Sequence, residues 1–178
     1  MKELIIFLVF LMCVTLSACG THKNETTDVV TEVTSEASSE ANMNMANPWT
    51  DCSSLDDAAK IAGFEMTVPD SVDGYPNTFI QAMQDNMIQV FFSDKDMDAT
   101  DRSDVLVRKG AGTDDISGDY NDYSQTESAE MSGMNVTLRG NDNKIFNVTW
   151  NSDGYSYAIV SDKGLERDTV EAIVGAVK

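Results

Sequence analysis

The sequence has very little histidine and cysteine, the residue types on which much enzyme and metal chemistry depends. Its only histidine is His22, and its three cysteines are Cys13, Cys19 and Cys52. Nucleophilic catalysis normally needs a positioned base, most often histidine, and zinc sites are built largely from histidine and cysteine. The composition therefore argues against a conventional hydrolase and against a zinc protein, and it suggests no cofactor.

Basic residues are also scarce. The chain has 12 Lys and Arg against 30 Asp and Glu, which gives a net charge of -18. Such a surface repels phosphate backbones and anionic lipid headgroups, so the sequence predicts no nucleic-acid partner. The charge itself has two interpretations, either solubility and spacing from an acidic envelope or the binding of cations.

The N-terminus has the pattern of an export signal. An apolar run from Leu4 to Val14 is too short to span a bilayer core, which needs about 20 residues, but it has the length of a signal-peptide core. Leu16-Ser17-Ala18-Cys19 follows directly and resembles the bacterial lipobox, in which the cysteine carries diacylglycerol. We therefore expect a signal peptide over residues 1–18 and lipid on Cys19; an ordinary secretory signal with a chance cysteine is the alternative.

Lipid on Cys19 predicts an outward-facing protein held at the cell membrane. One acyl chain binds membranes only marginally, whereas the two or more chains of a lipobox cysteine anchor stably. Because Cys13 leaves with the signal, Cys52 is the only remaining thiol, and no disulfide within the chain is expected. Cys52 is interpreted as a buried or half-buried small hydrophobe rather than a reactive thiol.

Two segments follow the signal peptide. Residues 19–46 are rich in Thr, Ser, Glu, Asn and Ala, and such a segment cannot bury enough apolar surface to offset its ordering entropy. It is predicted to be a disordered tether. Residues 47–178 are long enough for one extracytoplasmic domain.

The first half of this domain predicts one helix and several strands. Ser54 is a helix cap, the small apolar residues after it recur at helical spacing, and Gly63 is the stop. The predicted strands are Phe64–Val68, a hairpin of Phe79–Gln84 and Met87–Ser93 around Asp85-Asn86, and Val105–Lys109.

The C-terminal third predicts a three-stranded meander and a closing helix. Apolar and polar residues alternate in three segments, around Val136, around Val148 and around Tyr157. The apolar sets are Met134, Val136 and Leu138; Phe146, Val148 and Trp150; and Tyr155, Tyr157 and Ile159. The predicted pairs are Leu138 with Phe146, Val136 with Val148, and Trp150 with Tyr155, across loops at Asn141–Asn143 and Asn151–Gly154.

The predicted fold class is α+β: an antiparallel sheet of hairpins with one N-terminal and one C-terminal helix packed on it. The C-terminal helix is expected over Glu166 to Val177, with Val170, Ile173, Val174 and Val177 on one face that covers the aromatic face of the meander.

Three stretches of the domain also resemble a known group of proteins. They are Arg108 to Tyr123; Thr149-Trp150 followed by Asp153-Gly154-Tyr155-Ser156-Tyr157; and Asn47-Pro48-Trp49. Together they are similar to a family of uncharacterised exported lipoproteins from Gram-positive bacteria. The resemblance implies an α+β extracytoplasmic domain at a Gram-positive cell surface. It implies no activity and no site residue.

An acidic stretch near the middle of the chain, Asp94 to Asp104, is the first candidate site. Asp94, Asp96 and Asp98 alternate as the first calcium ligands of an EF-hand loop do. Ala99 replaces the expected glycine, and Val105 stands where the bidentate Glu belongs. The stretch is interpreted as a weak calcium candidate, or otherwise as a solvated acidic loop between two strands.

A second acidic stretch holds Asp114, Asp115, Asp119 and Asp122, interleaved with Gly118, Tyr120 and Tyr123. Paired carboxylates serve glycosidases when they face each other across a cleft. The favoured interpretation is a connecting loop with its tyrosines as packing anchors. The core is likewise the favoured interpretation, over stacking on sugar rings, for four aromatic residues: Trp49, Trp150, Tyr155 and Tyr157.

These observations favour a non-enzymatic binding or sensing domain at the cell surface, with an envelope protein or the cell wall as partner. Two alternatives stay open. One is a cell-wall glycan enzyme that uses Asp119 and a second aspartate, and the other is a calcium-stabilised module.

Overall fold

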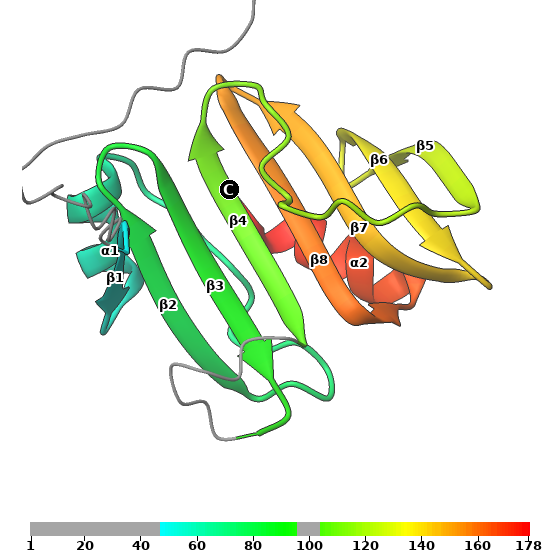
Figure 1. Ribbon diagram of the computed structural model, residues 1–178, viewed down its shortest axis with the longest axis horizontal. Helices are drawn as coiled ribbons and strands as arrows, with labels where there is room; N and C mark the ends of the chain where they lie inside the picture. Colours follow the sequence, from blue (N-terminus) through cyan, green and yellow to red (C-terminus); the bar gives the residue numbers. More distant parts are fainter. Residues whose placement is uncertain (1–46, 96–103) are drawn as a thin grey trace, which may run out of the picture. The chain divides into compact units, whose positions relative to one another are not determined.

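The computed structural model describes residues 47–95 and 104–178. Within this part of the chain, eight strands form one antiparallel sheet in the order β1-β2-β3-β4-β8-β7-β6-β5, with two helices (Figure 1). The strands are β1 (Trp49–Cys52), β2 (Asn77–Met83), β3 (Met87–Ser93), β4 (Val105–Ala111), β5 (Gln125–Met131), β6 (Met134–Asn141), β7 (Lys144–Ser152) and β8 (Tyr155–Leu165). The helices are α1 (Leu55–Ala62) and α2 (Arg167–Ala176), and neither is long and apolar enough to cross a bilayer. The predicted α+β class is confirmed.

One face of the sheet carries the hydrophobic core. A continuous row of apolar residues crosses six neighbouring strands, because each strand places every second side chain on this face. Successive residues of the row lie directly opposite each other on neighbouring strands. In order from β2 to β6, the row consists of Ile80, Val90, Val107, Ile159, Val148 and Leu138. Five of these six side chains are buried and Ile80 packs against them.

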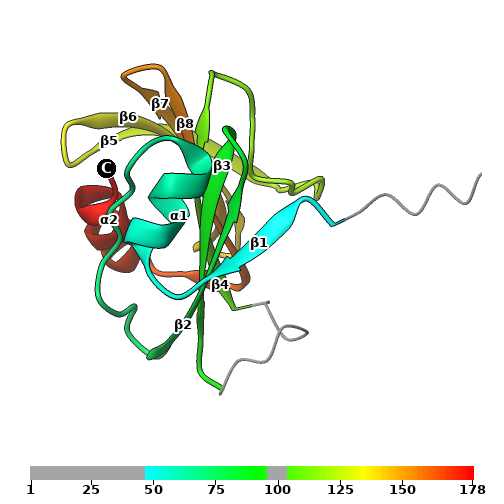
Figure 2. The same ribbon diagram turned by 90° about the vertical axis from the view of Figure 1, so that its left-hand side faces the viewer.

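Both helices lie on this core face, as the two views show (Figure 2). Helix α1 begins at Ser54, whose hydroxyl accepts a hydrogen bond from the Asp57 amide at 3.1 Å, and ends at Gly63 in the left-handed conformation, φ 81°. Helix α2 buries Val170, Ile173 and Val174 in the core. The opposite face, called the outer face below, has no helix on it in the described part of the chain.

The pairing of the meander differs from the predicted register by two residues. Leu138 pairs with Val148, not Phe146, and Trp150 pairs with Tyr157, not Tyr155. The turns are the tighter two-residue pairs Asp142-Asn143 and Asp153-Gly154, all four with positive φ, as type I′ turns require. Between β6 and β7 the tighter turn accounts for one residue of the shift and a bulge accounts for the other. A shift of two keeps each apolar set on its face, so the predicted faces survive the wrong register.

Phe146 is the exception to the predicted alternation. Opposite Arg139 and Gly140 of β6, a bulge inserts one residue, Phe146, into β7, and Ile145 rather than Phe146 packs against the core. Phe146 instead stacks on Tyr123, with ring centroids 5.8 Å apart. A bulge cannot be read from a period-two pattern, because it breaks that pattern.

The predicted strand Phe64–Val68 is wrong. The segment has no strand partner, because its polar groups bond to the end of α2 instead: the Thr67 amide donates to the Lys178 carbonyl at 3.1 Å and its hydroxyl to the Ala176 carbonyl at 2.8 Å. Strands β1 and β5 were not predicted from the sequence. They are the two edges of the sheet, and β5 is mostly exposed and polar, so it has no apolar alternation.

Candidate functional site

The long connection between β4 and β5, residues 112–124, crosses the outer face of the sheet. In Figure 1 it passes in front of β8 and β7, and Figure 2 shows it on the side away from both helices. We call it the outer-face loop. It contains the second acidic stretch identified in the sequence, so the candidate residues of that stretch lie together on one surface.

Asp119 is the central anchor of the outer-face loop. Its carboxylate accepts hydrogen bonds from the Tyr123 hydroxyl at 2.6 Å, from Asn147 Nδ2 at 3.0 Å, and from the amide and side chain of Asn121 at 3.0 and 2.7 Å. Burial opposes ionisation of Asp119, but the hydrogen bonds outweigh it, so the pKa lies below its ordinary value. Asp119 therefore ties the loop to β7.

Two further anchors come from β4 and β6. Arg108 Nη1 donates to the carbonyls of Ile116 and Ser117 at 2.9 and 2.8 Å, and burial lowers the pKa of this guanidinium. Arg139 pairs with Asp115 at 3.3 Å. For Asp115, burial again opposes ionisation, but hydrogen bonds from Ser117 and Arg139 bring its pKa below the ordinary value. The loop is thus held at several points along its length.

Tyr120 stands out from this anchored loop. Its side chain is 97% exposed, the only large hydrophobic side chain so exposed in the described part of the chain. Tyr123, three residues on, is half-buried against Phe146 and its phenol pKa rises to about 12, first through burial and then through the bond to Asp119. The predicted role of packing anchor therefore holds for Tyr123 and is wrong for Tyr120.

A polar row crosses the outer face beside the loop. It consists of the register neighbours Asp51, Gln81, Gln89 and Arg108 on β1 to β4 and Thr149 and Thr137 on β7 and β6, with the apolar Ala158 of β8 between the two groups. Over β1 to β4 these side chains bond to one another: Gln81 donates to Asp51 at 2.6 Å, Gln89 to Gln81 at 2.8 Å, and Arg108 to Gln89 at 3.0 Å. Gln81 and Gln89 are buried, so their pairing removes the penalty of unbonded buried amides.

The other half of this row opens into a groove. The groove has a volume of about 360 Å³ and lies between the outer-face loop and strands β6 and β7. Thr113, Asp114 and Asp115 line it from the loop. The strands contribute Asn135, Thr137, Arg139, Thr149, Trp150, Asn151 and Tyr157, the last of these from β8. Sequence reasoning assigned the polar residues of β6 to the face away from the core but did not identify them as a site.

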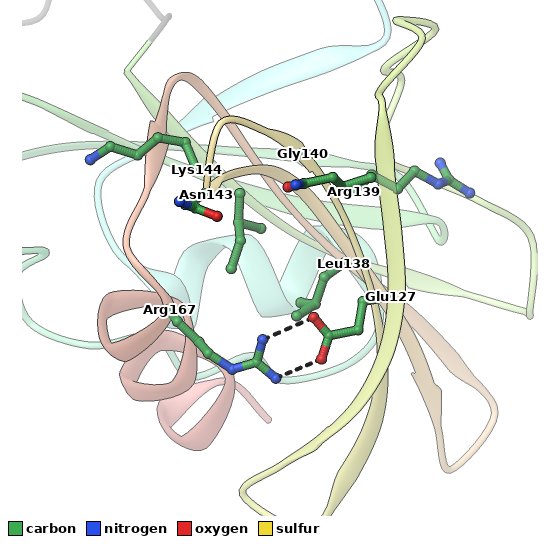
Figure 3. Close-up of a pocket in the computed structure, with 9 residues that line it drawn as sticks. Glu127, Leu138, Arg139, Gly140, Asn143, Lys144 and Arg167 are labelled. Atoms are coloured by element: carbon green, nitrogen blue, oxygen red, sulfur yellow. Dashed lines mark hydrogen bonds and ion pairs between the residues drawn. The ribbon is translucent and has the colours of Figure 1, made fainter.

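A second pocket, of about 300 Å³, lies between α2 and the β5–β6 hairpin (Figure 3). Arg167 and Glu127 form a two-point ion pair across it, at 3.1 and 3.0 Å. The other two cations that line it, Arg139 and Lys144, extend away from the pair in Figure 3. Because its charged groups do not converge on one point, this pocket is the weaker candidate.

The calcium candidates are only partly described. Asp94 pairs with Lys163 at 3.2 Å, whereas Asp96 and Asp98 lie outside the described residues, as does Cys19. Asp104, at the end of the same acidic stretch, is not solvated as predicted: it is 6% exposed and accepts bonds from Ser93 at 2.7 Å and Lys163 at 2.6 Å. Among the described residues, no three His, Cys, Asp or Glu side chains are grouped to hold a metal ion.

The aromatic residues of the meander belong to the core rather than to a sugar platform. Trp150 and Tyr157 are 4% and 5% exposed and stack on each other, with centroids 5.0 Å apart. Lys109 completes this region: its ammonium lies 4.5 Å from the ring centroid of Tyr155 and donates to the Glu65 carbonyl at 2.7 Å. Cys52 is half-buried against the core, as predicted.

The outer face thus combines an anchored loop, an exposed tyrosine and an open polar groove. Comparison of the chain with protein-family models, with curated protein sequences and with solved structures found no match.

Proposed function

We propose that the protein is a lipid-anchored extracytoplasmic lipoprotein that binds a component of the cell envelope through its outer face and does not transform it. The observation that carries the proposal is Tyr120, 97% exposed on a loop whose flanking residues are fixed by hydrogen bonds. Tyrosine is enriched in protein recognition surfaces, so its display on an anchored loop suits such a surface.

The rigidity of the loop supports this function. Ordering a loop or side chain on binding opposes association, and a surface already held in its bound conformation avoids that cost. The outer-face loop contains Tyr, Ser, Gly and Asn, a composition that antibody loops also use, because tyrosine offers large contact area with only two side-chain torsions. Asp119 and Arg108 supply the pre-organisation here.

The state of the carboxylates supports binding over catalysis. A glycosidase of the usual kind needs one carboxylic acid whose pKa is raised so that it can protonate the leaving group. Asp115 and Asp119 have lowered pKa values, and their oxygens already accept hydrogen bonds from the protein. Both are therefore suited to holding the loop.

The anchor is tested first. We expect the wild-type protein to sediment with membranes and to carry fatty acid, and Cys19→Ser to appear in the soluble fraction, because the substitution removes the acylation site. Metabolic labelling with a fatty-acid analogue measures this directly. Wild-type material that carries no label would remove the anchor from the proposal.

The recognition surface is tested at Tyr120. The full-length protein in detergent is mixed with purified cell envelopes, and bound protein is measured after sedimentation. Tyr120→Ser should lower binding at least about tenfold, as substitutions of central interface tyrosines do, whereas Tyr120→Phe should keep most of it. Equal binding by Tyr120→Ser and wild type would exclude the outer-face loop as the recognition surface.

A further inference from the structure

The groove beside the outer-face loop contains polar side chains that have no hydrogen-bond partner within residues 47–95 and 104–178. Thr137 and Thr149 are a cross-strand pair, half-buried, on the outer face of β6 and β7. Among the hydrogen bonds of the described residues, neither hydroxyl takes part in one, and neither do the side chains of Asn135 and Asp114. These groups are therefore available to a ligand.

The two ends of the polar row differ in whether their side chains are hydrogen-bonded. Between β1 and β4 the polar row is closed by its own hydrogen bonds, from Asp51 through Gln81 and Gln89 to Arg108. Between β7 and β6 the same row ends in the paired residues Thr149 and Thr137, which line the groove. Of the polar residues of this row, only Thr149 and Thr137, at the groove, take part in no side-chain hydrogen bond within the described part of the chain.

The charges and polar groups of the groove argue against anionic and apolar ligands. Its one cation, Arg139, is already paired with Asp115, and Asp114 adds a second negative charge. In a chain of net charge -18, this arrangement disfavours phosphates and other anions. An apolar ligand would leave the hydroxyls and amides without hydrogen bonds, which costs free energy.

We propose that this groove binds an uncharged, hydroxyl-rich carbohydrate of one to a few sugar rings. A threonine hydroxyl is both donor and acceptor, an asparagine amide offers two donors and one acceptor, and a carboxylate accepts; together they complement sugar hydroxyls, which also donate and accept. The volume of about 360 Å³ lies within the range of small-molecule sites, roughly 300 to 1,000 Å³. The inference rests on the proposed function, because it names the ligand class of the same outer face.

The test is isothermal titration of the full-length protein in detergent. The probes are maltotriose and tri-N-acetylglucosamine as neutral sugars and polygalacturonate as an anionic one; insoluble cell-wall material in a sedimentation assay then distinguishes a wall glycan from a free sugar. We expect saturable binding of at least one neutral probe at millimolar concentration and no binding of the anionic polymer. Preference for the anionic polymer, or binding of no saccharide, overturns the ligand class.

The site is identified by a pair of matched variants. Thr137→Val with Thr149→Val removes two hydroxyls while keeping side-chain shape and strand propensity, and should weaken sugar binding about tenfold or more. Thr78→Val with Thr126→Val changes two exposed strand threonines outside the groove and should leave affinity unchanged. Thermal melts check that both variants are folded. Sugar binding that is equal in all three proteins overturns the site.

The outcome also separates this inference from the proposed function. If envelope binding depends on Tyr120 while no saccharide binds, the protein is a binding domain for another ligand, and only the carbohydrate assignment fails. If neither envelope nor saccharide binds, both fail.

Discussion

Asp119 shows how one side chain can look catalytic in sequence and act structurally in the fold. An aspartate among other aspartates and tyrosines suggested a glycosidase carboxylate, but its oxygens accept hydrogen bonds from Tyr123, Asn121 and Asn147. Asn147 is fully buried, and within the described residues the bond from its Nδ2 to Asp119 is the one hydrogen bond of its side chain. The same carboxylate therefore satisfies a buried amide and fastens the loop.

Removal of this carboxylate should loosen the loop. We expect Asp119→Ala to lower the free energy of unfolding by about 2 kcal/mol, because it leaves the Asn147 amide buried without a partner, and to speed amide hydrogen exchange in residues 115–124. Urea denaturation and hydrogen-exchange mass spectrometry measure the two effects. Ultraviolet titration adds a third, since the pKa of Tyr123, about 12 in the wild type, should fall towards its ordinary value.

The matched control is Asp122→Ala, an exposed aspartate of the same loop. It should change the unfolding free energy by less than about 0.5 kcal/mol. If both variants were equally stable, Asp119 would not be the anchor that its contacts indicate.

At the scale of elements, polar contacts between strands hold the sheet together in addition to its hydrophobic core. Asp104, immediately before β4, accepts from Ser93 at the end of β3 and from Lys163 in β8. Burial opposes its ionisation, but the hydrogen bonds and the charge of Lys163 prevail and lower its pKa to about 2. A carboxylate in this state stabilises the fold only while it is ionised.

This link predicts a defined pH dependence. The folded pKa of Asp104, about 2, lies below the ordinary value of 3.8, so its contribution is complete above about pH 4 and is lost as the pH falls towards 2. We expect Asp104→Asn to cost about 2 kcal/mol of unfolding free energy at pH 7. The difference between wild type and variant should shrink below pH 4. A difference that stayed constant from pH 7 to pH 2 would contradict the assigned pKa.

At the scale of the whole molecule, the net charge of -18 is the dominant property. The described ion pairs are mostly exposed, such as Lys60–Asp57 and Lys144–Glu166, so each contributes little. General repulsion among the unpaired carboxylates should therefore outweigh them.

Salt should consequently stabilise the protein. We expect the thermal midpoint to rise between low and physiological sodium chloride concentration, because screening weakens repulsion over distances of about 10 Å and more. Calcium and magnesium chloride at equal concentration should then give the same midpoint. A higher midpoint in calcium alone would instead support the calcium-stabilised alternative at Asp94, Asp96 and Asp98.

The sequence by itself determined the features that depend on neighbouring residues. The alternation of Val136 with Thr137 fixed which side chains reach the core and which reach the outer face, because successive strand residues point to opposite sides. In the same way Ser54 and Gly63 bounded α1, since caps act on the helix turn beside them.

Only the tertiary structure decided what depends on residues far apart in the chain. The turns set the register, and the bulge at Phe146 redirected a side chain that alternation had placed in the core. Asp119 became an anchor because the topology brings β7 beneath its loop, and Thr137 and Thr149 line a groove because the same loop lies beside them. Local geometry decides the direction of a side chain, but only packing decides its partner.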